Sequence, residues 1–325
     1  MENMLFQNRI DLSALQQSVA AIKAQLRKVI VGQDDMIDLL LAALFANGHV
    51  LIEGMPGVAK TLTAKLLART LSVGFSRIQF TPDLMPSDVI GTSVFNPKTV
   101  EFRFNPGPIF SNFILIDEIN RAPAKTQSAL FEVMEERQVT VDGITYQMQK
   151  PFLVIGTQNP IEQEGTYRLP EAQLDRFIFK IIISYPTLDE EAEILFRHHQ
   201  RQSDTPVSMI EPVLTAEQIE VCQAIVHRIK VEDHLIRYIA ALTGKTRTSG
   251  DIYLGASPRA SIAILSTAKA IAAMQGRDFL IPDDIKTVAL PVLRHRIVLT
   301  PEREMQGASP DDVLKEILAK LEVPR

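Results

Sequence analysis

The chain of 325 residues is 46% hydrophobic and 22% charged, which is ordinary for a globular protein and gives enough length for one large or two ordinary domains. Its 39 acidic and 34 basic residues leave a net charge of −5, so no overall positive field favours nucleic acid or an anionic membrane as a partner. The single cysteine, Cys222, excludes an intramolecular disulfide framework. The longest apolar stretch, residues 39–46, is much shorter than the roughly 20 residues of a membrane span, and the N-terminus does not read as a secretory signal. We therefore expect a cytoplasmic protein.

Two helices are expected before the first strand. Residues 13–29 carry apolar side chains at helical intervals, and residues 36–45 form a second apolar run. Val31 and Gly32 interrupt the pattern between these two helices. We expect this short loop to contact the base of a bound nucleotide.

A phosphate-binding loop is predicted at residues 54–61, Gly-Met-Pro-Gly-Val-Ala-Lys-Thr, because this run lies between an apolar strand and a helix. Backbone N–H groups and the helix N-terminus would attract phosphate oxygens, Lys60 would reach the outer phosphates, and Thr61 would hold Mg²⁺. Ala59 replaces the usual last glycine, and we expect helical dihedral angles there, which alanine tolerates. The predicted nucleotide-binding residues are Val31, Gly32, Gly54, Pro56, Gly57, Val58, Ala59, Lys60, Thr61 and Leu62.

Two adjacent carboxylates end the apolar strand at residues 113–117. Side chains of successive strand residues point to opposite sides, so we expect separate roles for the two acids. Asp117 would hold Mg²⁺, and Glu118 would orient and activate water. The alternative is a simple helix cap, a role that Asn120 could also fill. Two carboxylates behind an apolar strand, close to a phosphate loop, favour an ATPase.

Strands and helices alternate through the first part of the chain, which predicts a parallel sheet between helices. Further apolar runs occupy residues 76–80, 152–157 and 179–185. Insertions at residues 83–110 and 138–148 each contain a hairpin signal, and we expect both to project from the sheet and offer surfaces for partners.

Only helices are expected beyond the first part of the chain, with residues 243–255 as a loop. Capping signals at Thr187, Thr215, Ser257 and Ser309 predict helix starts. The expected domains are a nucleotide-binding core at residues 1–186 and a helical domain at residues 187–325.

Three polar residues outside the first two motifs could act in hydrolysis. Asn159 follows an interior strand and could hold the attacking water, although an ordinary Asn-Pro turn explains it as well. Arg176, on a short helix between two strands, could be presented to a neighbouring subunit, and a local pair with Asp175 or Glu171, or a solvated surface position, is the alternative. Arg259 lies in the first turn of a capped helix, where a positive charge opposes the helix dipole and suggests a nearby anion. An ordinary surface arginine is the alternative for Arg259.

The motifs together resemble the MoxR group of AAA+ ATPases. The similarity covers about residues 30–300, and the segments that carry it are residues 54–61, 113–123, 156–162, 164–177 and 255–260. The resemblance implies an α/β fold, namely an AAA+ P-loop αβα core with a parallel sheet and a smaller all-helical lid domain. It identifies Asn159 as the first sensor, Arg176 as the arginine finger acting across a subunit boundary, and Arg259 as the second sensor.

The same resemblance implies ATP and Mg²⁺ as cofactors and a homo-oligomeric ring, usually a hexamer. Its members act as chaperone-type motors that assist assembly or metal-cofactor maturation of protein clients, often alongside proteins with a von Willebrand factor A domain. Three alternatives remain open at this point: a nucleic-acid-linked motor, a nucleotide-dependent scaffold, and a chelatase-type motor subunit. The first is disfavoured because residues 139–148 contain no lysine or arginine.

Overall fold

The computed structural model describes residues 10–98, 100–160, 167, 169–200 and 205–324. Within this part of the chain, five parallel strands form one sheet in the order β2, β5, β8, β1, β9. Their bounds are β1 (His49–Gly54), β2 (Phe75–Gln79), β5 (Phe113–Asp117), β8 (Leu153–Gln158) and β9 (Phe177–Ile183). The predicted parallel sheet is confirmed. Because the strands run parallel, all their carboxyl termini lie at one end of the sheet, here called the carboxyl end, and their amino termini lie at the amino end.

Both faces of this sheet are buried, and alternate residues of each strand belong to different cores. In β1, Val50 and Ile52 join a cluster with α1, α2, α3 and lid helices, whereas Leu51 joins a second cluster with α5. These helices are α1 (Ser13–Arg27), α2 (Asp34–Phe45), α3 (Lys60–Thr70) and α5 (Ala124–Glu136). Burial on two faces explains why the strands read as continuous apolar runs in the sequence.

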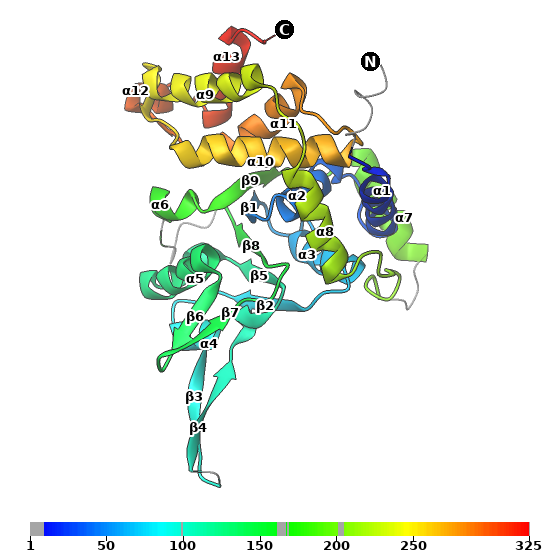
Figure 1. The fold of residues 1–325 in the computed structure, drawn as a ribbon, viewed down its shortest axis with the longest axis vertical. Helices are drawn as coiled ribbons and strands as arrows, with labels where there is room; N and C mark the ends of the chain where they lie inside the picture. Colours follow the sequence, from blue (N-terminus) through cyan, green and yellow to red (C-terminus); the bar gives the residue numbers. More distant parts are fainter. Residues whose placement is uncertain (1–9, 99, 161–166, 168, 201–204, 325) are drawn as a thin grey trace, which may run out of the picture.

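Both predicted insertions form antiparallel hairpins. The first contains α4 (Pro86–Ile90), β3 (Gly91–Asn96) and β4 (Glu101–Pro106), and it extends away from the body on the side opposite the lid (Figure 1). The second consists of β6 (Gln138–Val141) and β7 (Ile144–Gln147). Asp142 and Gly143 connect its strands with φ angles of 51° and 79°, as a primed two-residue turn requires.

The lid is mostly helical, and the predicted caps on its helices are confirmed at Thr215, Ser257 and Ser309. Thr187 and Glu190 make the reciprocal bonds of a capping box before α7. The helices are α7 (Leu188–Gln200), α8 (Ala216–His227), α9 (Asp233–Thr248), α10 (Pro258–Met274), α11 (Pro282–Leu293), α12 (Pro301–Met305) and α13 (Pro310–Lys320).

A small antiparallel sheet in the lid shows that the expectation of helices alone is wrong. It pairs β10 (Ile252–Leu254) with β11 (Val298–Leu299). The expected loop at residues 243–255 is also wrong in part, because α9 continues to its last residue at Thr248. Strands of three and two residues are too short to display an alternating pattern, so periodicity could not reveal them.

The lid packs closely on the core. Helix α10 contacts α2 of the core as well as α8, α9 and α11, and the buried residues of α10 and α11 belong to the same apolar cluster as α1, α2 and α3. The division at residue 186 stays a prediction. Among the described residues, no helix is both long and apolar enough to cross a membrane.

Candidate active site

The predicted phosphate loop connects the end of β1 to the start of α3, at the carboxyl end of the sheet. Gly54 pairs with Ile183 of β9, and a Cβ at Gly54 would lie 2.9 Å from the Ile183 carbonyl oxygen, which explains the glycine. Gly57 has a φ of 86° and open space on its side-chain side. Lys60 Nζ donates a hydrogen bond to the Gly54 carbonyl at 2.6 Å, so the lysine lies over the loop.

Ala59 adopts a left-handed conformation, with φ 59° and ψ 20°, so the expectation of helical dihedral angles there is wrong. The helix begins one residue later, at Lys60, and Ala59 occupies the N-cap position. For a residue with a Cβ the left-handed conformation costs about 1 to 2 kcal/mol, which explains why glycine is usual at the position.

Asp117, the last residue of β5, lies beside the phosphate loop. Its Oδ1 accepts hydrogen bonds from the hydroxyl groups of Thr61 at 3.4 Å and Thr157 at 3.2 Å. Arg77 Nε pairs with Oδ2 at 2.6 Å. The structure therefore brings the two predicted Mg²⁺ ligands, Thr61 and Asp117, together across 56 residues of sequence. Carboxylate and hydroxyl oxygens are the hard donors that Mg²⁺ prefers, so this pair fits the ion.

Glu118 does not belong to the strand. Its φ of 57° places it in the left-handed region between β5 and a 3₁₀ turn, η3 (Ile119–Arg121). Strand alternation is therefore the wrong reason for separating Glu118 from Asp117, although the two carboxylates do have different partners. Asn120 lies inside η3 and is not its cap.

The carboxylate of Glu118 is held by Gln79 Nε2 at 3.0 Å and by Arg121 Nε at 3.0 Å. Its backbone N–H donates to Thr157 Oγ1 at 3.1 Å. Thr157 thus contacts both acids, because its hydroxyl also donates to Asp117. Sequence reasoning missed Thr157 and the two β2 residues Arg77 and Gln79. The available signal was the alternation of Arg77 and Gln79 with Ser76 and Ile78, which predicts that both face the same way.

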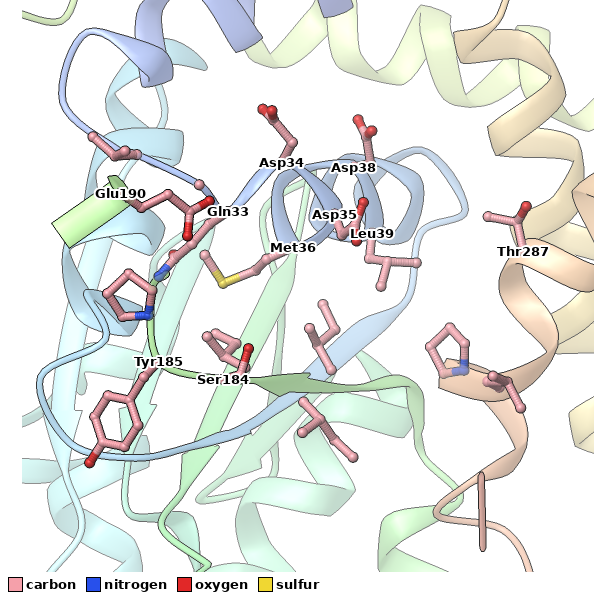
Figure 2. Close-up of a pocket in the computed structure, with 18 of the residues that line it drawn as sticks. Gln33, Asp34, Asp35, Met36, Asp38, Leu39, Ser184, Tyr185, Glu190 and Thr287 are labelled. Carbon is pink, nitrogen blue, oxygen red and sulfur yellow. The ribbon is translucent and has the colours of Figure 1, made fainter. Parts of the chain in front are cut away.

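A cavity of about 750 Å³ lies next to the phosphate loop, between α2, the carboxyl end of β9 and lid helix α11 (Figure 2). Val31 and Gly32, the residues expected to contact a base, line it. Gln33 connects this segment to the phosphate loop, since its Nε2 donates to the Val58 carbonyl at 2.8 Å. Glu190 lies close to Gln33 in Figure 2. The residues expected to contact a base therefore line a cavity that Gln33 connects to the phosphate loop.

Asn159 follows β8 directly and so lies at the carboxyl end of the sheet, like the phosphate loop and Asp117. Strand β8 separates β5 from β1. Asn159 lines a second cavity together with Glu53, Gln158 and Lys180. Glu53 pairs with Lys180 at 2.9 Å, and Gln158 donates a hydrogen bond to the same carboxylate.

Arg176 and Arg259 lie together, at the other end of the sheet. Arg176 immediately precedes β9, whose first residue, Phe177, pairs with the first residue of β1, His49. Arg259 lies in the first turn of α10. Both guanidinium groups pair with Glu135 at the end of α5: Arg259 Nη2 is 2.9 Å and Arg176 Nε is 3.6 Å from its carboxylate oxygens. The partner suggested for Arg176 by sequence, Asp175 or Glu171, is thus replaced by Glu135, which sequence reasoning missed.

The length of β1 separates the arginines from the phosphate loop of the same subunit. Its six residues run from the amino end to the loop, which at about 3.3 Å per residue corresponds to roughly 16 Å. The predicted site residues therefore form two groups. One group holds the phosphate loop, Asp117, Glu118 and Asn159, and the other holds the two arginines and Glu135.

Buried His49 fixes the position of the second group. Its Nδ1 accepts from the backbone N–H of Val154 at 3.0 Å, so Nε2 carries the proton and donates to the Met134 carbonyl at 3.1 Å. Burial, and to a smaller extent the positive charge of Arg137, lower the pKa of His49 to about 3. Arg137 also binds Asn47 through two hydrogen bonds of 2.6 Å. These bonds attach the end of α5, which carries Glu135, to the start of β1.

Comparison with known proteins identifies the class of fold. The family model "ATPase family associated with various cellular activities (AAA)" matches residues 49–179, and the "AAA lid domain" model matches residues 244–317. A crystal structure from Cytophaga hutchinsonii, described as that of a candidate ATPase, superimposes with a TM-score of 0.89 at 41% identity and covers 96% of this chain and 97% of that one. Fold and site therefore define an AAA+ ATPase with a lid.

Similar proteins that carry names identify the family to which this chain belongs. Chaperone MoxR1 of Mycobacterium tuberculosis is 44% identical over 93% of this chain and 81% of its own length. The uncharacterized protein YeaC of Bacillus subtilis is 47% identical over 92% of both chains. The chain belongs to the MoxR family of AAA+ ATPases.

Proposed function

We propose that the protein hydrolyses ATP in a Mg²⁺-dependent reaction, at sites that are completed between neighbouring subunits of a ring. The observation that carries this proposal is the separation of the site residues into two groups about one strand length apart. The two groups meet only if the amino end of the sheet in one copy faces the carboxyl end in the next. Repeated around a closed rotation axis, this contact forms a ring, which we propose is a hexamer.

Each residue of the first group has a distinct task in this reaction. ATP would supply the phosphoanhydride bond, and Mg²⁺ would neutralise charge on the phosphate oxygens. Lys60 and the N–H groups at the start of α3 would hold the phosphates, and Thr61 and Asp117 would hold the metal ion. Asn159 would orient the attacking water, and Glu118 would accept its proton. Glu118 has to exchange its contact with Gln79 or Arg121 for the water before it can do so.

The second group acts on the neighbouring subunit. Arg176 and Arg259 would approach the terminal phosphate bound by the adjacent copy and stabilise the charge that develops during transfer. An arginine in this role can raise the rate by about 10³ to 10⁵. Release of both side chains from Glu135, whose carboxylate they share, would accompany that approach.

We propose that the energy of hydrolysis remodels protein clients in the cytoplasm, assisting their assembly or metal-cofactor maturation, in cooperation with a protein that carries a von Willebrand factor A domain. Two facts support a protein client. A relative with 44% identity is named a chaperone. The β3–β4 hairpin also exposes apolar side chains far from the lid, including Phe102, which is 73% exposed.

ATP hydrolysis per subunit, measured while protein concentration rises at saturating ATP and Mg²⁺, tests the proposal. The specific rate should rise steeply and then level off, because each site needs a second copy. The matching assembly curve, from light scattering of the same samples, should rise over the same concentrations. Full specific activity in samples that scatter as monomers would contradict a shared site.

The variant Glu118→Gln keeps the shape of the side chain but removes the proton acceptor. It should bind ATP as the unchanged protein does and lose about 10²-fold or more of its turnover. Omission of Mg²⁺ should abolish turnover in both proteins. Normal turnover by Glu118→Gln would show that this residue is not the base.

A further inference from the structure

Asp175 occupies the junction between the two arginines, although it touches neither guanidinium group in the described contacts. It is the residue directly before Arg176. Its Oδ2 accepts a hydrogen bond from the Ser257 hydroxyl at 3.0 Å, and the oxygen of that hydroxyl accepts from the backbone N–H of Arg259 at 3.2 Å. One carboxylate of the core is therefore one residue away from the first arginine and two hydrogen bonds away from the backbone of the second.

The other oxygen of Asp175 holds a buried charge of the lid. Arg296 Nε pairs with Oδ1 at 2.6 Å, and the Arg296 side chain is only 3% exposed. Its remaining N–H groups donate to carbonyl oxygens on both sides of the junction, including Phe177 in β9 at 2.7 Å and Val292 in α11. A buried guanidinium requires a counter-charge, and within the described residues Asp175 is its carboxylate partner.

These contacts connect three segments that are distant in sequence: the residues before β9, the start of α10, and the residues after α11. His295 adds a further connection, since its Nε2 lies 2.9 Å from the Phe177 carbonyl oxygen. The lid is thus hydrogen-bonded to the amino end of the sheet, next to Arg176, which directly precedes β9. Displacement of the lid at this junction would have to break the Asp175 bonds to Ser257 and Arg296 together.

We propose that Asp175 is a positioning residue that holds the core arginine, Arg176, and the lid arginine, Arg259, as one rigid unit, which one subunit presents to the ATP of the next. This inference rests on the proposed function, because it concerns the same shared site. The inference predicts that the effect of Asp175 depends on which side of a subunit boundary it occupies. Asp175 should matter in the subunit that donates the arginines and not in the subunit that holds the nucleotide.

A mixing experiment with two inactive variants of the full chain tests this direction. Lys60→Ala subunits keep the arginines but cannot hold the phosphates, and Arg176→Ala subunits keep the phosphate loop but lack the core arginine. Mixed rings should recover ATP hydrolysis at joints where a Lys60→Ala subunit donates to an Arg176→Ala subunit. Absence of any recovery would overturn the shared site itself, and the inference about Asp175 with it.

Asp175→Asn is then added to one component at a time. In the Lys60→Ala donor it should lower the recovered kcat by roughly tenfold or more, since misplacement of a reacting group by about 1 Å can cost about 10² in rate. The KM for ATP should stay unchanged, because the nucleotide is bound by the other subunit. In the Arg176→Ala acceptor the same substitution should have no effect. Equal losses in both positions, or no loss in the donor, would overturn the positioning role.

Two further variants guard against general damage to the fold. Ser257→Ala in the donor removes the connection to α10 while leaving Arg296 its counter-charge, and it should lower the recovered kcat by a smaller factor, again only in the donor. Asp283→Asn changes an exposed lid carboxylate that pairs with Lys286 on its own helix, and it should leave recovery unchanged. Loss with Asp283→Asn as large as with Asp175→Asn would indicate nonspecific disruption of the lid and overturn the assignment.

Discussion

The carboxyl end and the amino end of the sheet assemble their functional residues in different ways. At the carboxyl end, the phosphate loop, Asp117 and Asn159 lie at or directly after the ends of β1, β5 and β8, which are adjacent in the sheet. At the amino end, Glu135, Arg176 and Arg259 come from the end of α5, the residue before β9, and a lid helix. The first group comes from the strands and the segments that directly follow them, whereas the second includes a residue of the lid and depends on how the lid packs.

Because of this difference, the two groups should respond to substitutions in different parts of the protein. The strand order and the start of α3 place Thr61 near Asp117, so changes in the lid should leave that pair intact. The arginines require the buried contacts of His49, Asp175 and Arg296, and a change in any of these should alter the second group first. Binding of nucleotide and its hydrolysis should therefore respond to different substitutions.

Removal of Arg176 is the most direct test of whether the amino end affects hydrolysis without affecting nucleotide binding. Arg176→Ala should lower kcat by about 10³-fold or more while the Kd for a fluorescent ATP analogue stays within about a factor of two, because we propose that the residue acts on a neighbour's nucleotide. Arg237→Ala, at an exposed position of α9, serves as the control and should change neither value. Loss of nucleotide binding in Arg176→Ala would place the arginine in its own subunit's site.

Acid should weaken the amino end through His49. Burial lowers the pKa of His49 to about 3 in the folded protein, whereas the ordinary value is 6.5, so between these values the unfolded chain binds a proton that the folded chain does not. The contribution of neutral His49 to the free energy of unfolding is therefore fully present above pH 6.5, and it is lost as the pH drops toward 3. Between pH 7 and pH 5 the loss from this one group is about 2 kcal/mol.

Urea unfolding at pH 7 and pH 5 measures this loss. The variant His49→Gln cannot titrate, and its amide can both accept from Val154 and donate to Met134. It should be less stable than the unchanged protein at pH 7, yet lose about 2 kcal/mol less between the two pH values. Identical pH dependence in both proteins would show that His49 is not the acid-sensitive group. His295, whose pKa burial also lowers well below its usual value, contributes in the same direction in both proteins.

The smallest expected effect concerns Ala59, in the phosphate loop at the carboxyl end. Ala59→Gly removes the cost of the left-handed conformation, about 1 to 2 kcal/mol, but adds entropy to the unfolded chain, so we expect a net gain of about 0.5 kcal/mol in unfolding free energy. Ala24→Gly, at an exposed helical position of α1, should instead lose about 1 kcal/mol. Destabilisation by Ala59→Gly would mean that the loop tolerates its alanine without strain.

Sequence patterns predict the carboxyl end well because its determinants are local. A glycine-rich run before a helix and an apolar strand ending in acids each occupy a few consecutive residues, and parallel strands bring such ends together. The left-handed conformations of Ala59 and Glu118 escaped prediction, since neither residue type signals a positive φ. Glu135 escaped for a different reason. It lies in the last turn of an amphipathic helix as an ordinary charged residue, and only the three-dimensional packing shows that two arginines share it.

The placement of the two groups at opposite ends of β1 also constrains symmetry. In a two-fold dimer, residue i of one copy contacts residue j of the other and the reverse, so an antiparallel pair would complete two sites at once and leave no free end for a third subunit. The head-to-tail, heterologous contacts of the proposed ring instead give the assembly a polarity. Every subunit would then sense the nucleotide of one neighbour and offer its own to the other, so that a change at one joint passes around the ring in a single direction.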